Sequence, residues 1–120
     1  MKLKISSVAD KGLLEKERIV LKAVTALDVG NFLLLQTGFN DKEVTISMHH
    51  AYWFPYKQIS AGDLVVIYTK TGTDSEKSIS NGHTAHFFYW GLSSAIWKST
   101  VRAPVLLHAS EWESRSPQEL

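Results

Sequence analysis

The histidines are the residues of this chain best suited to metal binding or acid–base chemistry. His49 and His50 are adjacent, and His83 and His86 lie three residues apart. Neutral imidazole is a ligand for zinc, copper and nickel. In an extended strand, however, adjacent residues and residues three apart point to opposite faces, so at most one histidine of each pair can join a given site. The spacing favours half-exposed strand or loop histidines. A small metal- or ligand-binding protein stays open as an alternative.

The carboxylates offer two further arrangements. Asp74 and Glu76 flank a serine and have the oxygen ligands that calcium prefers, but the twelve-position pattern of an EF-hand loop is absent. Glu111 and Glu113 lie two apart, so on a strand they share a face, as the carboxylates of a glycosidase must. No second feature of a sugar site accompanies them, and charges that protect an edge strand explain them better.

Motifs of nucleophilic, phosphate-binding or zinc-protease chemistry do not occur in the chain. There are also no cysteines, which removes disulfides, thiolate ligands and thiol nucleophiles together. We therefore expect a protein that is not an enzyme and that carries neither a metal ion nor another cofactor.

Aromatic residues give the strongest functional signal, because they gather in two clusters. The clusters consist of Tyr52, Trp53, Phe54 and Tyr56, and of Phe87, Phe88, Tyr89 and Trp90. Successive strand residues alternate between faces, so about half of each cluster points away from a single-sheet core. The outer rings are either covered by loops or form an exposed patch, and such patches mark interaction sites. The predicted interaction surface comprises Tyr52, Trp53, Tyr56, Phe87, Tyr89 and Trp90, with Asp74 and Glu76 in a neighbouring loop.

The composition is that of one folded domain. The 120 residues are 44% hydrophobic and 21% charged, and 13 basic residues nearly balance 12 acidic ones to give a net charge of +1. With no basic patch, we expect no nucleic-acid partner. No apolar run is long enough to cross a bilayer, and the first residues alternate like a strand rather than forming a signal peptide. A cytoplasmic, soluble protein with a protein partner is expected, and homo-oligomers remain possible.

The hydrophobic pattern has a period close to two along much of the chain, which predicts strands. Strands are expected at residues 3–8, 17–24, 32–36, 44–48, 52–54, 64–69, 84–90 and 105–112. The polar stretch from Lys70 to Asn81 predicts a long, mobile loop. The stretch from 91 to 101 is irregular, with Ile96 and Trp97 as a buried anchor. The pattern predicts a single all-β, antiparallel sandwich or small barrel over residues 1–113, followed by a flexible tail at 114–120.

Several segments in this order resemble the lamin tail domain family. The segments that carry the resemblance are Ile5–Val8 with Gly12 and Glu17–Leu21, Asp28–Leu34, Phe54-Pro55 with Ile59 and Ala61–Val66, and Trp90-Gly91 with Ile96-Trp97 and Val105–Leu107. The nearest match is Phe-Pro, a short spacer and a glycine turn before a valine-rich strand. Two departures are Arg102-Ala103-Pro104, where such families place Gly-Asp, and a longer loop between Gly72 and Gly82.

The resemblance implies a fold and a role. It implies an immunoglobulin-like β-sandwich that binds or scaffolds other proteins, and it transfers no catalytic residue to this chain. Together with the aromatic clusters, it predicts a non-enzymatic protein-interaction or scaffolding module. In such a module the aromatic strands would make the contacts and the loop from Lys70 to Gly82 would add specificity. A self-assembling structural subunit is the remaining alternative.

Overall fold

The computed structural model describes all residues from 1 to 120, and its secondary structure is almost entirely β. The strands are β1 (Leu3–Ala9), β2 (Arg18–Ala23), β3 (Leu27–Asp28), β4 (Phe32–Phe39), β5 (Val44–Trp53), β6 (Gln58–Ile59), β7 (Leu64–Tyr68), β8 (Ser75–Ser78), β9 (Thr84–Tyr89) and β10 (Arg102–His108). Three short 3₁₀ turns span Val29–Asn31, Ser80–Gly82 and Pro117–Glu119. The prediction of an all-β protein is confirmed. No helix is long and apolar enough to span a membrane.

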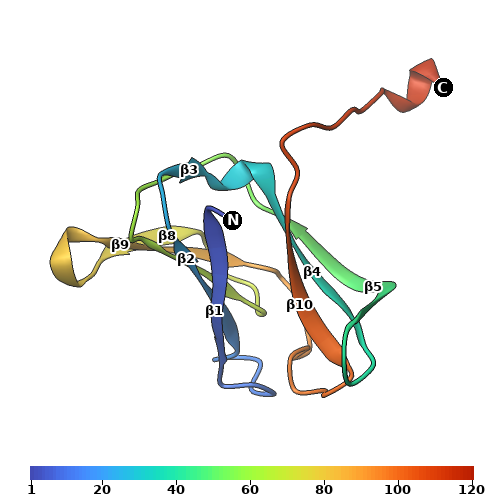
Figure 1. Ribbon diagram of the computed structural model, residues 1–120, viewed down its shortest axis with the longest axis horizontal. Coiled ribbons are helices and arrows are strands. Elements are labelled where there is room, and N and C mark those ends of the chain that lie inside the picture. Colours follow the sequence, from blue (N-terminus) through green and yellow to red (C-terminus); the bar gives the residue numbers. More distant parts are fainter.

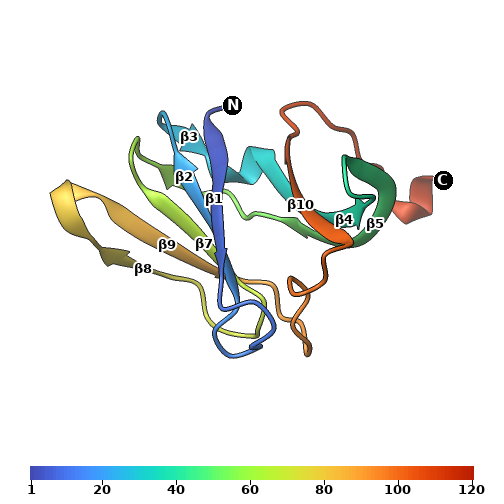
Figure 2. The same ribbon diagram turned by 60° about the horizontal axis from the view of Figure 1, so that its bottom comes forward.

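Two main sheets face each other across one core (Figures 1 and 2). The five-stranded sheet has the order β1-β2-β7-β9-β8, and the three-stranded sheet has the order β10-β4-β5. Strands β3 and β6 form a small separate ladder. In Figure 1 the chain beyond β10 leaves the sheets and extends away from them to the C-terminus.

The core lies between the inner faces of these sheets. Ile19 on β2, Ile67 on β7 and Phe88 on β9 meet Phe32 and Leu34 on β4 in one buried cluster. Alternate residues on each strand belong to this cluster, as the period of two requires. Burying such side chains is worth roughly 1.5–3 kcal/mol each, so this alternation fixes which face of each strand turns inward.

The expectation of purely antiparallel pairing is wrong for one pair of strands. Strand β9 runs parallel to β7, with Leu64 opposite Ala85 and Tyr68 opposite Tyr89. The cause is the order of the strands in space: β9 lies between β7 and β8, although β8 comes between them in sequence. The chain therefore passes β9's position to form β8 first, and then returns to fill the gap.

The expected loop from Lys70 to Asn81 is also corrected, because it contains β8. Ser75 pairs with Phe87 and Ser78 with Thr84 in an antiparallel ladder. All four residues of β8 are exposed. An edge strand with both faces in water has no apolar alternation, so its composition resembles that of a loop.

Two predicted strands, 44–48 and 52–54, are one strand, β5. Its pairing with β4 shifts at His49, since His50 lies opposite Gln36 and Met48 lies opposite Thr37. This bulge inserts an extra residue and breaks the alternation in the sequence.

The last strand begins and ends earlier than predicted, at Arg102 and His108 rather than 105 and 112. Pro104 lies within it, opposite Gln36. A proline is tolerated here because β10 is an edge strand, whose outer side needs no N–H donor. The irregular segment at 91–101 agrees with prediction, and Trp97 is buried in the core as expected.

A fully buried carboxylate, that of Glu17, fixes this irregular segment in place. Its Oε1 accepts hydrogen bonds from the backbone N–H groups of Gly12 (2.9 Å) and Trp97 (3.0 Å). Its Oε2 accepts from the Thr69 hydroxyl (2.5 Å) and the Ile96 N–H (2.9 Å). No salt bridge involves Glu17, so backbone and hydroxyl dipoles alone stabilise its charge. Burial raises the pKa of Glu17, but the four hydrogen bonds outweigh that effect and hold the pKa below its usual value.

Replacing Glu17 by glutamine is expected to lower the free energy of unfolding by about 3 kcal/mol, because an amide cannot accept all four hydrogen bonds and presents N–H groups to buried donors. Urea unfolding at neutral pH measures the change. Glu15→Gln is the matched control, since Glu15 is exposed, and it is expected to change stability by less than about 0.5 kcal/mol. Equal stability of Glu17→Gln and wild type would contradict this role.

The same carboxylate predicts an acid dependence. Its folded pKa lies below the usual value of 4.5, so the unfolded chain binds the proton first as the pH falls. The stabilisation is therefore complete above about pH 4.5 and is lost as the pH drops through the folded pKa. Denaturant titrations at a series of acidic pH values should show a shallower loss of stability in Glu17→Gln than in wild type. Parallel curves for the two proteins would argue against it.

Candidate functional site

His86 is buried and pairs with a buried carboxylate, which corrects the expectation of a half-exposed histidine. Its Nε2 lies 2.8 Å from Oδ2 of Asp63. Asp63 also accepts hydrogen bonds from the N–H groups of Ser60 (3.1 Å) and Thr84 (3.0 Å). Burial raises the pKa of Asp63. These hydrogen bonds and the charge of His86 lower it by more, so the net pKa lies below its usual value. The pair joins the turn before β7 to β9, and Gly62 (φ 87°) completes that turn.

The other histidines of the two predicted pairs are dispersed. His49 is exposed in the bulge of β5. His50 meets the ring of Trp90 edge-on, with centroids 6.3 Å apart. His83 lies against Gly62, where an added Cβ would fall 2.3 Å from its ring. No group of three or more His, Cys, Asp and Glu side chains is close enough together to hold a metal ion.

The carboxylates considered as calcium ligands or as a catalytic pair are also separated. Glu76 forms an ion pair with Lys57 at 3.1 Å. Burial, and to a smaller extent the negative charge of Asp74, raise the pKa of the Tyr52 phenol to about 12. Glu111 and Glu113 lie beyond the end of β10 and are exposed, so they do not face a cleft from one strand.

The aromatic residues predicted as one surface lie in three places. Tyr52 and Trp90 pack against the core, with ring centroids 5.8 Å apart. Phe87 and Tyr89 belong to β9 in the five-stranded sheet, whereas Trp53 ends β5 in the three-stranded sheet and Tyr56 follows it. The two clusters are on different sheets, and alternation then divides each of them.

Tyr68 of β7 and Tyr89 of β9 form a stacked pair with two cations over the Tyr68 ring. Tyr89 stacks on Tyr68, with centroids 5.4 Å apart and planes at 12°. Lys70 and Arg18 lie over the Tyr68 ring at 5.3 and 5.8 Å. Gly72 contacts Tyr89 so closely that an added Cβ would fall 2.3 Å from the ring. The chain itself therefore covers part of this pair and leaves little free ring surface.

Aromatic residues from the end of β5, the segment after it and the segment after β10 line an open cavity of about 300 Å³, which we name the aromatic hollow. Its lining residues are Gly30, Trp53, Phe54, Pro55, Tyr56 and Trp112. Three of its rings remain open to solvent: Trp53 is 46% exposed, Trp112 52% and Tyr56 68%. No charged side chain lines the hollow.

Asp28 holds the two backbone segments of the hollow together. Its Oδ1 accepts from the N–H groups of Gly30 (2.9 Å) and Lys57 (3.0 Å). The indole N–H of Trp53 then donates to the Gly30 carbonyl at 2.9 Å. An added Cβ on Gly30 would fall 2.8 Å from the Tyr56 Cα, so only glycine allows this approach. Trp53 and Tyr56 are thus positioned by backbone contacts rather than by the core.

Trp112 completes the hollow, and the sequence did not reveal it as a site residue. Its ring meets that of Trp53 at 87° with centroids 4.9 Å apart. Trp112 belongs to the segment that follows β10, where the Ala109 N–H donates to the Asn31 carbonyl at 2.7 Å and holds the start of this segment beside Gly30 of the hollow. A lone tryptophan in an otherwise polar terminal stretch was the only signal in the sequence.

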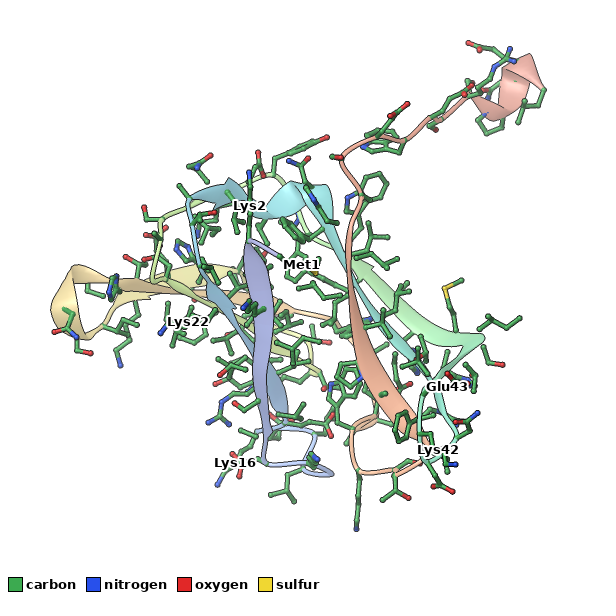
Figure 3. All side chains as sticks on the ribbon, in the orientation of Figure 1. Met1, Lys2, Lys16, Lys22, Lys42 and Glu43 are labelled. Atoms are coloured by element: carbon green, nitrogen blue, oxygen red, sulfur yellow. The ribbon has the colours of Figure 1, made fainter.

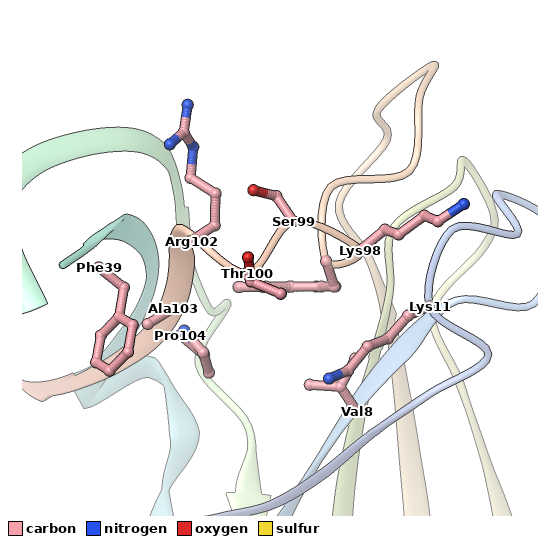
Figure 4. Close-up of a pocket in the computed structure, with 10 residues that line it drawn as sticks. Val8, Lys11, Phe39, Lys98, Ser99, Thr100, Arg102, Ala103 and Pro104 are labelled. Carbon is pink, nitrogen blue, oxygen red and sulfur yellow. The ribbon is translucent and has the colours of Figure 1, made fainter. Parts of the chain in front are cut away.

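A second cavity, of about 330 Å³, opens beside the start of β10 (Figure 4). Lys11, Lys98 and Arg102 are among its lining residues. Figure 4 shows the side chains of Lys98 and Arg102 extending to opposite sides. The three cations therefore do not converge on a common point where an anion would sit.

The outer face of the three-stranded sheet carries almost no charge. Arg102 is the only lysine, arginine, aspartate or glutamate in β4, β5 and β10. Leu107 and the β5 residues Ile46 and Met48 are exposed, Ile46 completely. Figure 3 shows Lys2, Lys16 and Lys22 beside β1 and β2, and Lys42 and Glu43 at the turn between β4 and β5. Charges thus lie on the other sheet and at the turn, and an apolar face is left open.

No protein-family model matches this chain, and no curated protein shows significant sequence similarity to it. The geometry of the described sites is therefore the basis for any functional conclusion.

Replacing Asp28 by alanine is expected to destabilise the protein by about 1–2 kcal/mol and to change the environment of Trp53, because two backbone N–H groups lose their acceptor. Asp28→Asn retains an oxygen at the same position and should recover most of the loss. Thermal unfolding measures the first effect and the indole N–H resonance of Trp53 the second. An unchanged resonance in Asp28→Ala would show that Asp28 does not position the hollow.

Proposed function

We propose that this protein is a non-enzymatic protein-interaction module with an immunoglobulin-like β-sandwich similar to a lamin tail domain. Two sheets packed across one core support the proposed fold. So does the placement of the Ala61-Gly62-Asp63 turn directly before the buried strand β7. The parallel pairing of β7 with β9 is the feature of this chain that an antiparallel sandwich does not have.

The observation that carries the proposed function is the uncharged outer face of the three-stranded sheet. Monomeric soluble proteins rarely expose large contiguous apolar patches, and those that occur mark interaction sites. Here Leu107, Met48 and Trp53 are exposed on three-stranded-sheet strands that contain one charged residue. Such a face suits an apolar protein surface better than nucleic acid, which needs an array of cations.

The non-enzymatic part of the proposal rests on the buried carboxylates. Glu17 and Asp63 are the buried acids, and every oxygen of both accepts hydrogen bonds from within the protein. A general acid or base must reach a substrate proton. Neither carboxylate lines any of the described cavities.

Introducing a charge on the outer face tests this proposal. Leu107→Asp should abolish retention of a partner captured from lysate of the natural source and identified by quantitative mass spectrometry, because the carboxylate would have to be desolvated in the contact. Leu13→Asp is the matched control: Leu13 is an exposed leucine in the turn before β2, 56% exposed against 43% for Leu107. Capture that is identical for wild type and both variants would refute the proposed surface.

Sedimentation velocity over a range of concentrations distinguishes a second copy of the chain from another protein as the partner. Association that grows with concentration in wild type and Leu13→Asp, but not in Leu107→Asp, would identify the face as a self-association surface. This outcome would favour a self-assembling subunit, for which the fully exposed Ile46 and its neighbour Met48 on the edge strand β5 are a specific indication.

A further inference from the structure

We infer that the aromatic hollow binds an organic cation, namely an alkylated ammonium group of the kind found in trimethyl-lysine or choline. The inference rests on the proposed function, because Trp53 belongs to the same interaction region. It adds the chemical class of the group that would be recognised there. Three observations lead to it: the arrangement of the rings, the charged residues beside them in the chain, and the small number of polar groups that line the hollow.

The rings supply the surfaces that a cation requires. Trp53 and Trp112 stand at 87° to each other with centroids 4.9 Å apart, and Tyr56 lines the same cavity. In this edge-to-face contact the edge of one indole covers part of the face of the other, and the ring faces left open line the cavity together with that of Tyr56. The face of an aromatic ring is its electron-rich side. Tryptophan is the residue that attracts cations most strongly, and cages of this kind bind quaternary ammonium groups.

The charges beside the hollow favour a cation over a neutral group. Glu111 and Glu113 are the chain neighbours of Trp112, and both are exposed and form no salt bridge. Each Cα lies about 3.8 Å along the chain from that of Trp112, which is shorter than the screening length of about 8 Å. We therefore expect these two carboxylates, the charges next to Trp112 in the chain, to attract a cation to it.

The cations closest in the chain to these residues are paired with other acids. Lys57 follows Tyr56 in the chain but pairs with Glu76 at 3.1 Å. Arg115 follows Glu113 by two residues and pairs with Glu119 at 3.7 Å. Neither residue lines the hollow.

The side chains of the hollow carry only three polar groups, the indole N–H groups of Trp53 and Trp112 and the hydroxyl of Tyr56. The indole N–H of Trp53 is already bonded to the Gly30 carbonyl at 2.9 Å. The hollow thus presents mainly ring faces and a proline. A trimethylammonium group fits such a lining because it carries a charge, has no N–H to satisfy and has an apolar surface of methyl groups.

The test is an NMR titration that follows the indole N–H resonances of Trp53 and Trp112. The probes are choline chloride and its neutral carbon isostere, in which a tert-butyl group replaces the trimethylammonium group. Choline should bind about fivefold more tightly than the isostere, because only the cation gains from the ring faces and from the two carboxylates. No shift with choline, or equal shifts with both probes, would overturn the inference.

Variants assign the binding to the named residues. Trp112→Ala should abolish the choline shifts and Trp112→Phe should restore part of them. The double change Glu111→Gln with Glu113→Gln should weaken binding and reduce its salt dependence. Leu13→Ala is the control, because Leu13 is exposed in the turn before β2 and does not line the hollow. Choline binding that survives in Trp112→Ala would place the site elsewhere and overturn the assignment.

Two further arms distinguish the source of the cation and the main competing ligand. Acetyl-trimethyl-lysine amide, compared with acetyl-lysine amide, reports a modified protein chain, whereas choline alone reports a small molecule or a headgroup. A proline-rich peptide that shifts the indoles in place of choline would overturn the cation in favour of polyproline recognition. Loss of partner capture in Leu107→Asp, with no choline binding in wild type, would overturn the cation site alone and leave the interaction module in place.

Discussion

The buried carboxylate of Glu17 is the interaction on which most of this fold depends. Three segments outside the strands meet at this carboxylate. They are the turn at Gly12, Thr69 just after β7, and the irregular stretch that contains Ile96 and Trp97. Buried backbone N–H groups need an acceptor, and a carboxylate can serve several at once. Asp28 and Asp63 act in the same way at two other reversals of the chain. The sheets thus supply the core, and three carboxylates supply the joints between its irregular parts.

This use of the acidic residues explains where the proposed recognition surfaces lie. The buried carboxylates of Glu17 and Asp63 accept hydrogen bonds within the protein, so their oxygens are occupied. What remains for other molecules is the apolar outer face of the three-stranded sheet and the aromatic hollow beside it. Asp28 connects the two roles, because the same oxygen that closes the turn before β4 fixes the segment carrying Tyr56. The proposed recognition thus rests on a backbone arrangement that hydrogen bonds fix in place, and such preorganisation would reduce the ordering cost of binding.

The sequence was a good guide wherever one face of a strand is buried. The apolar alternation at Leu64–Tyr68 and Thr84–Tyr89 predicted β7 and β9. It failed where this alternation is absent or interrupted, at the polar edge strand β8 and at the bulge of β5. It could not indicate that β9 inserts beside β7, because strand order depends on contacts distant in sequence. Glu17 looked like an ordinary strand charge, since glutamate is seldom buried. Of the hollow, Trp53 and Tyr56 were predicted, while Trp112 depends on the path of the chain after His108.

Native-state hydrogen exchange of the amides of Gly12, Ile96 and Trp97 tests the central role of Glu17 most directly. These amides lie outside regular strands, where exchange is ordinarily fast. If Glu17 joins their segments to the core, they should exchange only when the whole protein unfolds, with the same free energy of opening as Ile19 on β2 and Ile67 on β7. Exchange of these amides at the rate of freely opening loops would contradict the account, because the carboxylate of Glu17 would then not join these segments to the core.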